Sequence, residues 1–273
     1  MRTIEIKSDS CRKCGLCARS CVCYVFEQAE PATVPEVKAP GACIECGHCI
    51  SVCPSGSVIH SELDNAAVRP VKMNISPDDM EEFLSSKRSI RNFRDKPVAT
   101  DIVERLIIVA SKAPSDANSQ ERVFLVVSDA ENINKMESDI IDGYRQFVAA
   151  MEAKGVADDM IEVARCRFII KSYENGAHPV FKKAPCVIFA YGPENNNFSW
   201  YNCAAAMDYL MLQAHSMGLG SCVIGKALYE PEHINGVLEI PEGSRVYSAV
   251  TLGYPVLKYA KSAGRRPADI KWL

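Results

Sequence analysis

The first part of the chain is dominated by two copies of one cysteine pattern. The first copy reads Cys11-Arg-Lys-Cys14-Gly-Leu-Cys17-Ala-Arg-Ser-Cys21, and the second reads Cys43-Ile-Glu-Cys46-Gly-His-Cys49-Ile-Ser-Val-Cys53-Pro54. Three thiolates at two-residue spacing surround one iron–sulfur cubane, and the fourth cysteine of such a run ligates the other cubane. Disulfide frameworks and zinc sites are the competing interpretations, but zinc ligands usually come in separate pairs. The spacing therefore predicts two [4Fe–4S] clusters and a role in electron transfer.

Each predicted cluster takes ligands from both copies of the pattern. One cluster is expected to use Cys11, Cys14, Cys17 and Cys53, and the other Cys43, Cys46, Cys49 and Cys21. A ninth cysteine, Cys23, lies two residues after Cys21. It either replaces Cys21 as a ligand or is a buried thiol with no ligand role, and the second interpretation is favoured.

Beyond the cysteine patterns, the chain is long enough for a second domain with its own core. It has 273 residues, of which 48% are hydrophobic, and a formal net charge of −3 with acids and bases interspersed, so nothing indicates a nucleic-acid surface. No apolar run reaches the length of a membrane span, and the N-terminus lacks a signal-peptide layout. Clusters and free thiols suit a reducing compartment. We therefore expect a cytoplasmic protein of an anaerobe that binds neither nucleic acid nor a membrane.

Three segments follow from these patterns: a cluster domain at 1–62, a linker at 63–75 and a larger domain at 76–273. Within the cluster domain, the proline-bearing stretch 31–41 is expected to form a loop or a short ribbon. In the larger domain, helices are expected to begin at Ser76 and at Thr100-Asp101, to occupy much of 130–172, and to run from 200 to 217 before Gly218. Strands are expected at 122–127, 186–191 and 246–253. This alternation predicts an α/β or α+β domain.

Four polar or glycine-rich segments of the larger domain are candidates for ligand binding. They are Lys87–Arg91, Ala113–Gln120, Gly218–Gly225 and Gly264–Pro267. The two basic segments could bind a phosphate, and the glycines could let a ligand approach the backbone. Taken singly, each has an ordinary structural interpretation: a solvated basic turn, a polar loop, a helix cap or a charged tail.

In this order, the segments resemble the nitroreductase family of FMN-dependent flavoenzymes. The resemblance rests on Arg88-Ser-Ile-Arg91-x-Phe93, Ala113-Pro-Ser115-x2-Asn118-x-Gln120, the helix that ends in Gly218-Leu-Gly-Ser221, Leu252-Gly-Tyr-Pro255, and the terminal arginines. It implies an α+β fold with a mixed sheet and surrounding helices, and a homodimer with two FMN molecules at the subunit interface. The whole chain is similar to ferredoxin–nitroreductase fusions found in anaerobes.

Carried over residue by residue, the resemblance implies a set of flavin contacts. Lys87, Arg88, Ser89 and Arg91 would hold the phosphate and the pyrimidine edge of FMN, and Arg265 and Arg266 would complete the phosphate site. Pro114, Ser115, Asp116 and Asn118 would approach FMN from the opposite subunit. Val223, Ile224, Gly225 and Lys226 would pass near the flavin N5 and O4. Asp116 departs from the small neutral residue common at its position, which leaves its role open. The helix through Ala204, Ala205, Tyr209, Met211 and Gln213 would build the dimer core.

Both parts together predict an oxidoreductase that receives electrons through its clusters and reduces a small organic acceptor, such as a nitroaromatic or a quinone. FMN would deliver hydride from N5, and Arg91 would stabilise the reduced flavin. No Gly-x-Gly-x-x-Gly turn is present, so the expected donor is reduced ferredoxin or another low-potential carrier rather than NAD(P)H.

Two alternatives remain open. The chain could be a redox relay or sensor that passes electrons to a protein partner, or a relative that dehalogenates its substrate or modifies the flavin. The five histidines, His48, His60, His178, His215 and His233, are assigned no catalytic role because the sequence shows no partner for any of them.

Overall fold

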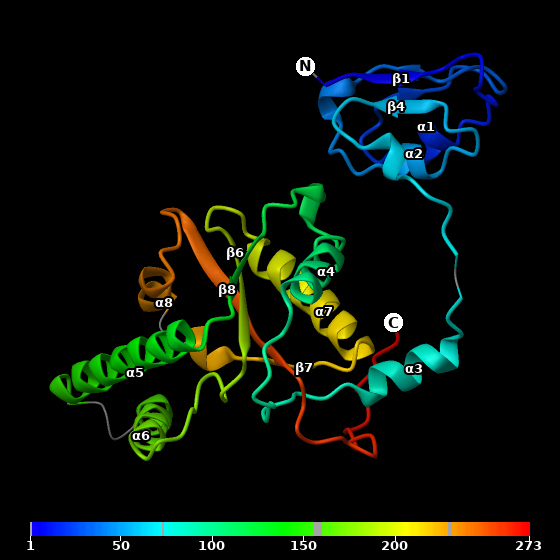
Figure 1. Ribbon diagram of the computed structural model, residues 1–273. Coiled ribbons are helices and arrows are strands. Elements are labelled where there is room, and N and C mark those ends of the chain that lie inside the picture. The colour runs from blue at the N-terminus through cyan, green and yellow to red at the C-terminus, as the bar shows by residue number, and fades with distance from the viewer. Residues whose placement is uncertain (1, 73, 156–159, 229–230) are drawn as a thin grey trace. The chain divides into compact units, whose positions relative to one another are not determined.

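The computed structural model describes residues 2–72, 74–155, 160–228 and 231–273, and the chain divides into two compact units (Figure 1). The first unit extends to Asn74 and also takes in Ala117–Ser119; the second comprises Ile75–Asp116 and Gln120–Leu273. The division thus falls at the end of the expected linker. The grouping of residues 117–119 with the first unit has no signal in the sequence.

The first unit contains two separate two-stranded antiparallel sheets and two short helices. Its elements are β1 (Ile4–Ile6), α1 (Leu16–Ser20), β2 (Phe26–Glu27), β3 (Glu36–Val37), α2 (His48–Ser51) and β4 (Val58–His60), with 3₁₀ turns at Pro40–Ala42 and Asn65–Ala67. β1 pairs antiparallel with β4, so Ile4 lies opposite His60 and Ile6 opposite Val58. β2 and β3 form the ribbon around the proline-bearing stretch. A core of Val25, Phe26, Ile50 and Val58 packs against the cysteines.

The second unit is built on a four-stranded sheet with the order β5-β6-β8-β7, in which neighbouring strands are antiparallel. The strands are β5 (Val123–Val127), β6 (Cys186–Pro193), β7 (Gly220–Val223) and β8 (Ser244–Gly253). The helices are α3 (Pro77–Ser86), α4 (Thr100–Ala110), α5 (Ala130–Ala153), α6 (Ile161–Glu174), α7 (Ser199–Ser216) and α8 (Pro231–Val237). None of the described helices is long and apolar enough to cross a lipid bilayer.

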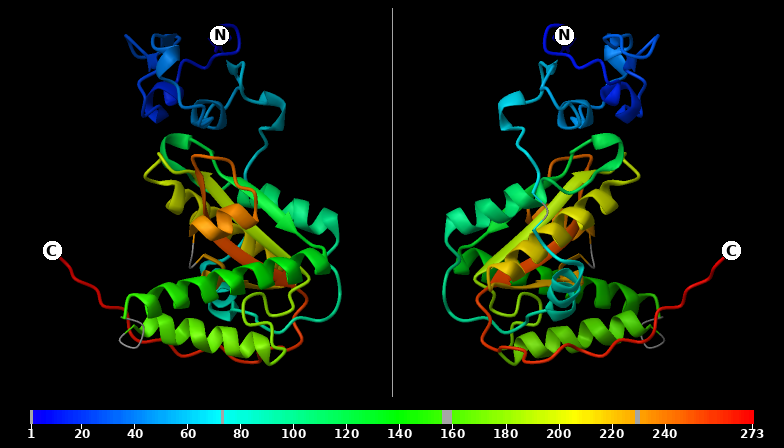
Figure 2. Two further views of the ribbon diagram at one scale, coloured as in Figure 1. Left: turned by 90° about the vertical axis from the view of Figure 1, so that its left-hand side faces the viewer. Right: turned by 90° about the vertical axis from the view of Figure 1, so that its right-hand side faces the viewer.

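Helices cover both faces of this sheet, so the central strand β6 is buried on two sides (Figure 2). Because side chains alternate along a strand, Cys186 and Ile188 pack in one core with α4 and α7. Val187 and Phe189 point the other way and pack in a second core with α5, α6 and α8. The burial of both faces explains why residues 186–191 read as an unbroken apolar run.

Of the two N-terminal caps expected from the sequence, for α3 and α4, the structure shows one. Ser76 caps α3 as expected, because its hydroxyl accepts a hydrogen bond from the Asp79 backbone N–H at 3.1 Å. The cap expected at Thr100-Asp101 is wrong: Ala99 precedes α4 without a side-chain cap, and Thr100 is already helical. Strand β7 was not predicted, because its glycine-rich sequence was interpreted as a ligand-binding segment.

Candidate cofactor sites

The cysteines of the first unit surround two separate cavities. Each cavity is lined by three cysteines of one copy and the fourth cysteine of the other. The first is lined by Cys11, Cys14, Cys17 and Cys53, and the second by Cys43, Cys46, Cys49 and Cys21. These are the two ligand sets expected from the spacing. The thiols surround a volume rather than a point, and in the described residues no three His, Cys, Asp or Glu side chains could hold a single metal ion.

Backbone N–H groups point at cysteine sulfurs in the same way in both copies. Lys13 N lies 3.4 Å from Cys11 Sγ, and Glu45 N lies 3.3 Å from Cys43 Sγ. The fourth cysteines repeat the arrangement: Val25 N donates to Cys21 Sγ at 3.4 Å, and Ser57 N donates to Cys53 Sγ at 3.2 Å. Such donors stabilise the negative charge of a metal-bound thiolate. The donor sets therefore fit two iron–sulfur clusters.

Cys23 lies beside one of the two proposed cluster sites. It is half-buried and lines the cavity that Cys21, Cys43, Cys46 and Cys49 surround. The geometry therefore keeps both interpretations of Cys23 open, as a reserve ligand or as a thiol without a ligand role.

In the second unit, the basic segment after α3 lies along the edge of the sheet. Ile90 N donates to Ser221 O of β7 at 3.0 Å, and Arg94 N donates to Tyr254 O at 2.8 Å. Gly220 makes this pairing possible, because a Cβ at that position would lie 2.6 Å from the Ile90 side chain. Gly220 therefore makes room for Ile90, which fixes the segment in place.

This pairing leaves two cations of the segment partly buried. Burial lowers the pKa of Lys87, an effect that nearby Cys222 and Asp208 oppose, and Lys87 Nζ lies 3.6 Å from the sulfur of Met211. Arg88 Nη1 donates to Ser85 O and Lys87 O, whereas its Nη2 is buried with no partner in the described structure. An unpaired buried guanidinium nitrogen is costly unless an anion binds it.

A second group of cations gathers at the end of β7. Burial and the charges of Lys182 and Arg91 lower the pKa of Lys226, and the charge of Glu137 opposes the shift. Glu137 is itself fully buried and occupied, since Oε1 accepts from Val180 N at 2.7 Å and Oε2 lies 2.8 Å from His178 Nδ1. The local excess of positive charge favours a bound anion. Lys182 was not found from the sequence, because nothing in it links residue 182 to residue 226.

The polar loop 114–118 lies against the start of α7. Asp116 N donates to Asn202 Oδ1 at 3.1 Å, and the Asp116 carboxylate accepts from the side-chain amides of Asn202 and Asn196. Ser115 Oγ accepts from Gln120 N at 3.1 Å. Asn118 is half-buried with φ 57°, and Pro114 is exposed. Asp116 thus has a structural task, which is to hold the loop to α7.

The remaining candidates differ in how exposed they are. Val223 is exposed at the end of β7, Ile224 is buried, and Gly225 has open space where a side chain would point. Arg265 and Arg266 lie in an exposed C-terminal tail outside any helix or strand. Their proposed part in the phosphate site therefore stays a prediction.

The structure shows partners for four of the five histidines. His178 pairs with Glu137, His215 Nε2 lies 2.7 Å from Ser86 Oγ, and His233 Nε2 lies 2.6 Å from Asp139 O. His60 contacts Cys43. These partners are 17 to 129 residues away in the chain, which is why the sequence alone conceals them.

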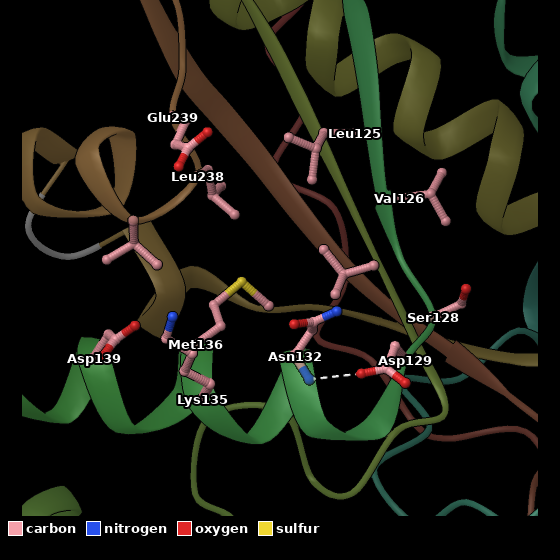
Figure 3. Close-up of a pocket in the computed structure, with 12 residues that line it drawn as sticks. Leu125, Val126, Ser128, Asp129, Asn132, Lys135, Met136, Asp139, Leu238 and Glu239 are labelled. Carbon is pink, nitrogen blue, oxygen red and sulfur yellow. Dashed lines mark hydrogen bonds between the residues drawn. The ribbon is translucent and has the colours of Figure 1, made fainter.

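Besides a cavity of about 640 Å³ whose lining includes Phe93, Ser128 and His178, two cavities of the second unit are large enough for an organic molecule. One, of about 720 Å³, is lined mainly by apolar residues of α5 and α6 and reaches Gly225 and Lys226. Its lining residues are Tyr144, Ile161, Ala164, Arg165, Cys166, Phe168, Ile169, Gly225 and Lys226. The other, of about 430 Å³, lies between β5, α5 and residues 237–239 (Figure 3). It contains no expected site residue, and its Asp129 caps α5 by accepting from Asn132 N at 2.9 Å.

Comparisons with known proteins agree with both parts of the chain. Residues 84–254 match the model of the nitroreductase family, and residues 3–69 match that of a 4Fe-4S dicluster domain. A protein of Archaeoglobus fulgidus with the provisional name NADH dehydrogenase/NAD(P)H nitroreductase is 28% identical over 183 residues, which cover 64% of this chain and 87% of the relative. A 4-nitrobenzoate reductase of Pseudomonas putida is 22% identical over 218 residues, with 72% and 95% coverage.

Solved structures share the fold. A nitroreductase with bound FMN from Bacteroides fragilis has a TM-score of 0.58 at 20% identity, and the match covers 71% of this chain and 98% of that one. The predicted fold class is therefore confirmed.

Proposed function

Since this chain belongs to the nitroreductase family, we propose that it takes electrons from a low-potential carrier such as reduced ferredoxin and uses them to reduce a small organic molecule. Family membership and the dicluster match make it an FMN-dependent oxidoreductase with two [4Fe–4S] clusters. When bound, FMN accepts electrons one at a time and can release two together. The described structure contains no disulfide bond, which supports placement in a reducing cytoplasm.

The observation that carries the proposal is the set of cations with too little opposing charge beside β7. Lys87 and Arg88 would bind the flavin phosphate, the anion that the buried Arg88 Nη2 lacks. Arg91 and Lys226, joined by Lys182, would face the ring and favour its reduced, anionic form. Ser89, Val223, Ile224 and Gly225 complete the proposed contacts of one chain. In the first unit, the four thiols around each cavity are the proposed ligands of one cluster.

A homodimer would supply the rest of the flavin site. Loop 114–118 is held at Asn202, whereas Lys87 contacts Met211, nine residues further along α7, or about 13 Å along a helix axis. Within one chain, loop 114–118 and Lys87 are therefore held apart. In the homodimer that the family resemblance implies, the loop at each flavin would come from the second subunit. The outer face of α7 exposes Trp200, Tyr201 and Tyr209, which suits a helix that packs against a second copy. Arg265 and Arg266 of the exposed tail would act in the same assembly.

The acceptor is proposed to bind in the cavity of about 720 Å³ between α5 and α6. Its wall contains the aromatic side chains of Tyr144 and Phe168, which suit a flat aromatic molecule. Among the described residues of its lining, Arg165 and Lys226 are charged and none is acidic. The cavity therefore suits an aromatic acceptor that carries a negative charge.

Anaerobic turnover with a panel of acceptors tests this function. Reduced ferredoxin should drive rapid reduction of a nitroaromatic or a quinone, and NADH or NADPH should drive it slowly. Among nitroaromatics, a carboxylate should be preferred over its methyl ester. Arg165→Gln should remove this preference, whereas Arg167→Gln should keep it, because Arg167, also on α6, pairs with Glu152 of α5 at 2.8 Å. Failure to reduce any of the panel would favour a redox relay, and turnover of a haloaromatic alone would favour a dehalogenase.

Arg88→Ala should weaken FMN binding by about 1.5–3 kcal/mol, the range for loss of a hydrogen bond to a charged group. This corresponds to roughly a 10- to 150-fold rise in Kd. Fluorescence titration of the flavin-free protein measures it. Arg105→Ala is the matched control, since Arg105 is an exposed arginine on α4. Equal affinity of the two variants for FMN would show that Arg88 does not bind the flavin.

A further inference from the structure

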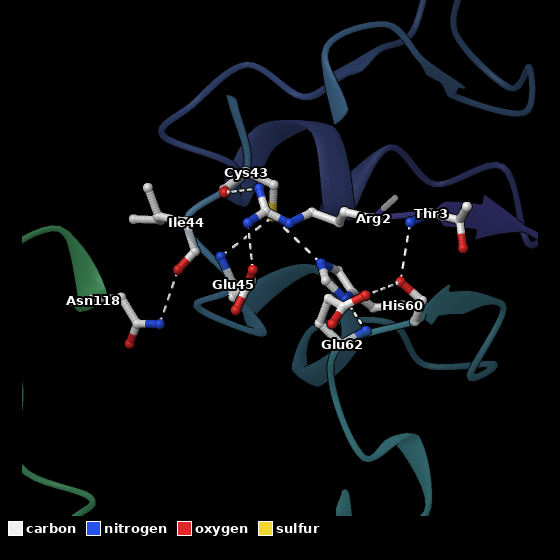
Figure 4. A network of polar contacts seen from close by, with 9 residues as sticks. Arg2, Thr3, Cys43, Ile44, Glu45, His60, Glu62 and Asn118 are labelled. Atoms are coloured by element: carbon white, nitrogen blue, oxygen red, sulfur yellow. Dashed lines mark hydrogen bonds and ion pairs between the residues drawn. The ribbon is translucent and has the colours of Figure 1, made fainter. Parts of the chain in front are cut away.

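His60 of β4 is aimed at the sulfur of a proposed cluster ligand. Its side chain is only 1% exposed, and its Nε2 lies 3.5 Å from Cys43 Sγ. Figure 4 shows the ring beside Cys43 and Glu62. Arg2 reaches the same place and donates to Cys43 O and to the Glu45 carboxylate. The contact is therefore part of an ordered polar network.

The backbone fixes which nitrogen of His60 carries the proton. Glu62 N donates to His60 Nδ1 at 3.1 Å, so Nδ1 acts as an acceptor. A neutral imidazole with an accepting Nδ1 carries its hydrogen on Nε2, and that hydrogen points at Cys43 Sγ. Asn65 holds the residue on both sides, since its Oδ1 accepts from His60 N at 3.3 Å and its Nδ2 donates to His60 O at 2.9 Å.

The other proposed cluster has no equally directed side-chain donor in the described structure. The backbone donors match between the two sites, as Lys13 N and Ser57 N correspond to Glu45 N and Val25 N. The difference lies in the side chain: Ser55 Oγ is 3.7 Å from Cys53 Sγ and only 2.8 Å from Ser57 Oγ. Either hydroxyl can donate to the other, so the Ser55 hydrogen is not fixed on the sulfur as the His60 Nε2 hydrogen is.

We infer that His60 donates an N–H···S hydrogen bond to Cys43 and raises the reduction potential of the cluster held by Cys21, Cys43, Cys46 and Cys49 above that of its neighbour. Reduction adds negative charge that spreads onto the sulfurs, and a donor aimed at a sulfur stabilises the reduced state more than the oxidised one. This inference rests on the ligand sets proposed above. It assigns the two clusters an order: an electron entering the first unit settles on the cluster beside His60.

The test is a reductive titration of the intact, cluster-loaded protein, followed by electron paramagnetic resonance. His60→Phe keeps a ring in the buried position but removes the donor. At a fixed solution potential, the ratio of reduced to oxidised cluster should fall on the order of tenfold, which is 59 mV for a one-electron couple. The fall should affect one cluster, while the cluster of Cys11, Cys14, Cys17 and Cys53 keeps its potential. His60→Gln, which retains an N–H donor, should recover part of the shift.

Two outcomes would overturn the inference: an unchanged potential in His60→Phe protein with full iron content, or an equal shift of both clusters. If the variant loses iron, wild-type protein labelled with ¹⁵N-histidine settles the matter. Pulsed paramagnetic resonance of the reduced cluster should then detect one histidine nitrogen and an exchangeable proton, and absence of that coupling rejects the bond. Protein that carries no clusters at all would instead refute the proposed ligand sets.

Discussion

A chain that begins at Ile75 is expected to bind FMN as the full protein does and to lose nearly all turnover driven by reduced ferredoxin. The second unit holds its own sheet and two hydrophobic cores, and the proposed flavin contacts lie within it or in the residues retained around the 114–118 loop. Removing the first unit takes away the clusters and, with them, the proposed path for single electrons.

Flavin content and ferredoxin-driven turnover of the two proteins provide the measurement. Dithionite is the control, because it reduces free and bound flavin directly and should support acceptor reduction by both proteins. A shortened protein that still turns over with ferredoxin would show that electrons enter elsewhere. One that turns over efficiently with NADPH would show that nicotinamide is a sufficient donor.

The second large effect is expected at the fourth cysteine of each copy. Cys53→Ser should destroy mainly the cluster of Cys11, Cys14 and Cys17, although Cys53 belongs to the other copy of the pattern. The cavity lining explains why: Cys53 lies with those three thiols, whereas the other cysteines of its own copy line the second cavity. Iron and sulfide should fall from about eight to about four of each per chain. Loss of the neighbouring cluster instead would reverse the ligand assignment.

Cys21→Ser is the matched partner experiment, and it also decides the role of Cys23. Cys23 lines the cavity of Cys21, whereas no ninth thiol lines the cavity of Cys53 among the described residues. If Cys23 is a reserve ligand, Cys21→Ser protein keeps both clusters and only the double variant with Cys23→Ser loses one. If Cys23 has no ligand role, Cys21→Ser alone removes a cluster, and Cys23→Ser alone removes none.

Local spacing made the cluster sites predictable. A cubane requires thiols at fixed, short separations, so the pattern from Cys11 to Cys53 specifies the two groupings that the cavities display. The same holds for the Ser76 cap and the buried strand β6, where the signal lies within a few residues. Thr100 shows the limit, because a good capping residue can also be the first residue of a helix.

Features that depend on distant residues were not predictable. Strand β7 pairs with β8, and its Gly220 makes room for Ile90, which lies 130 residues earlier in the chain. The glycine that permits this contact weakens the strand signal. Lys182 joins the cationic group only because the buried carboxylate of Glu137 holds the turn at Val180 and Phe181. A hydrogen bond from a distant carboxylate to the backbone produces no recognisable pattern in the sequence.

The pairing of β1 with β4 has a consequence for how the protein is made. Because Ile4 pairs with His60, the first unit closes only after the whole of it has left the ribosome, where synthesis proceeds from the N-terminus. Cys11, Cys14 and Cys17 emerge well before Cys53, the thiol that completes their cavity. A maturation factor that loads iron and sulfide must therefore act after residue 60 has been synthesised, or protect three exposed thiols until then.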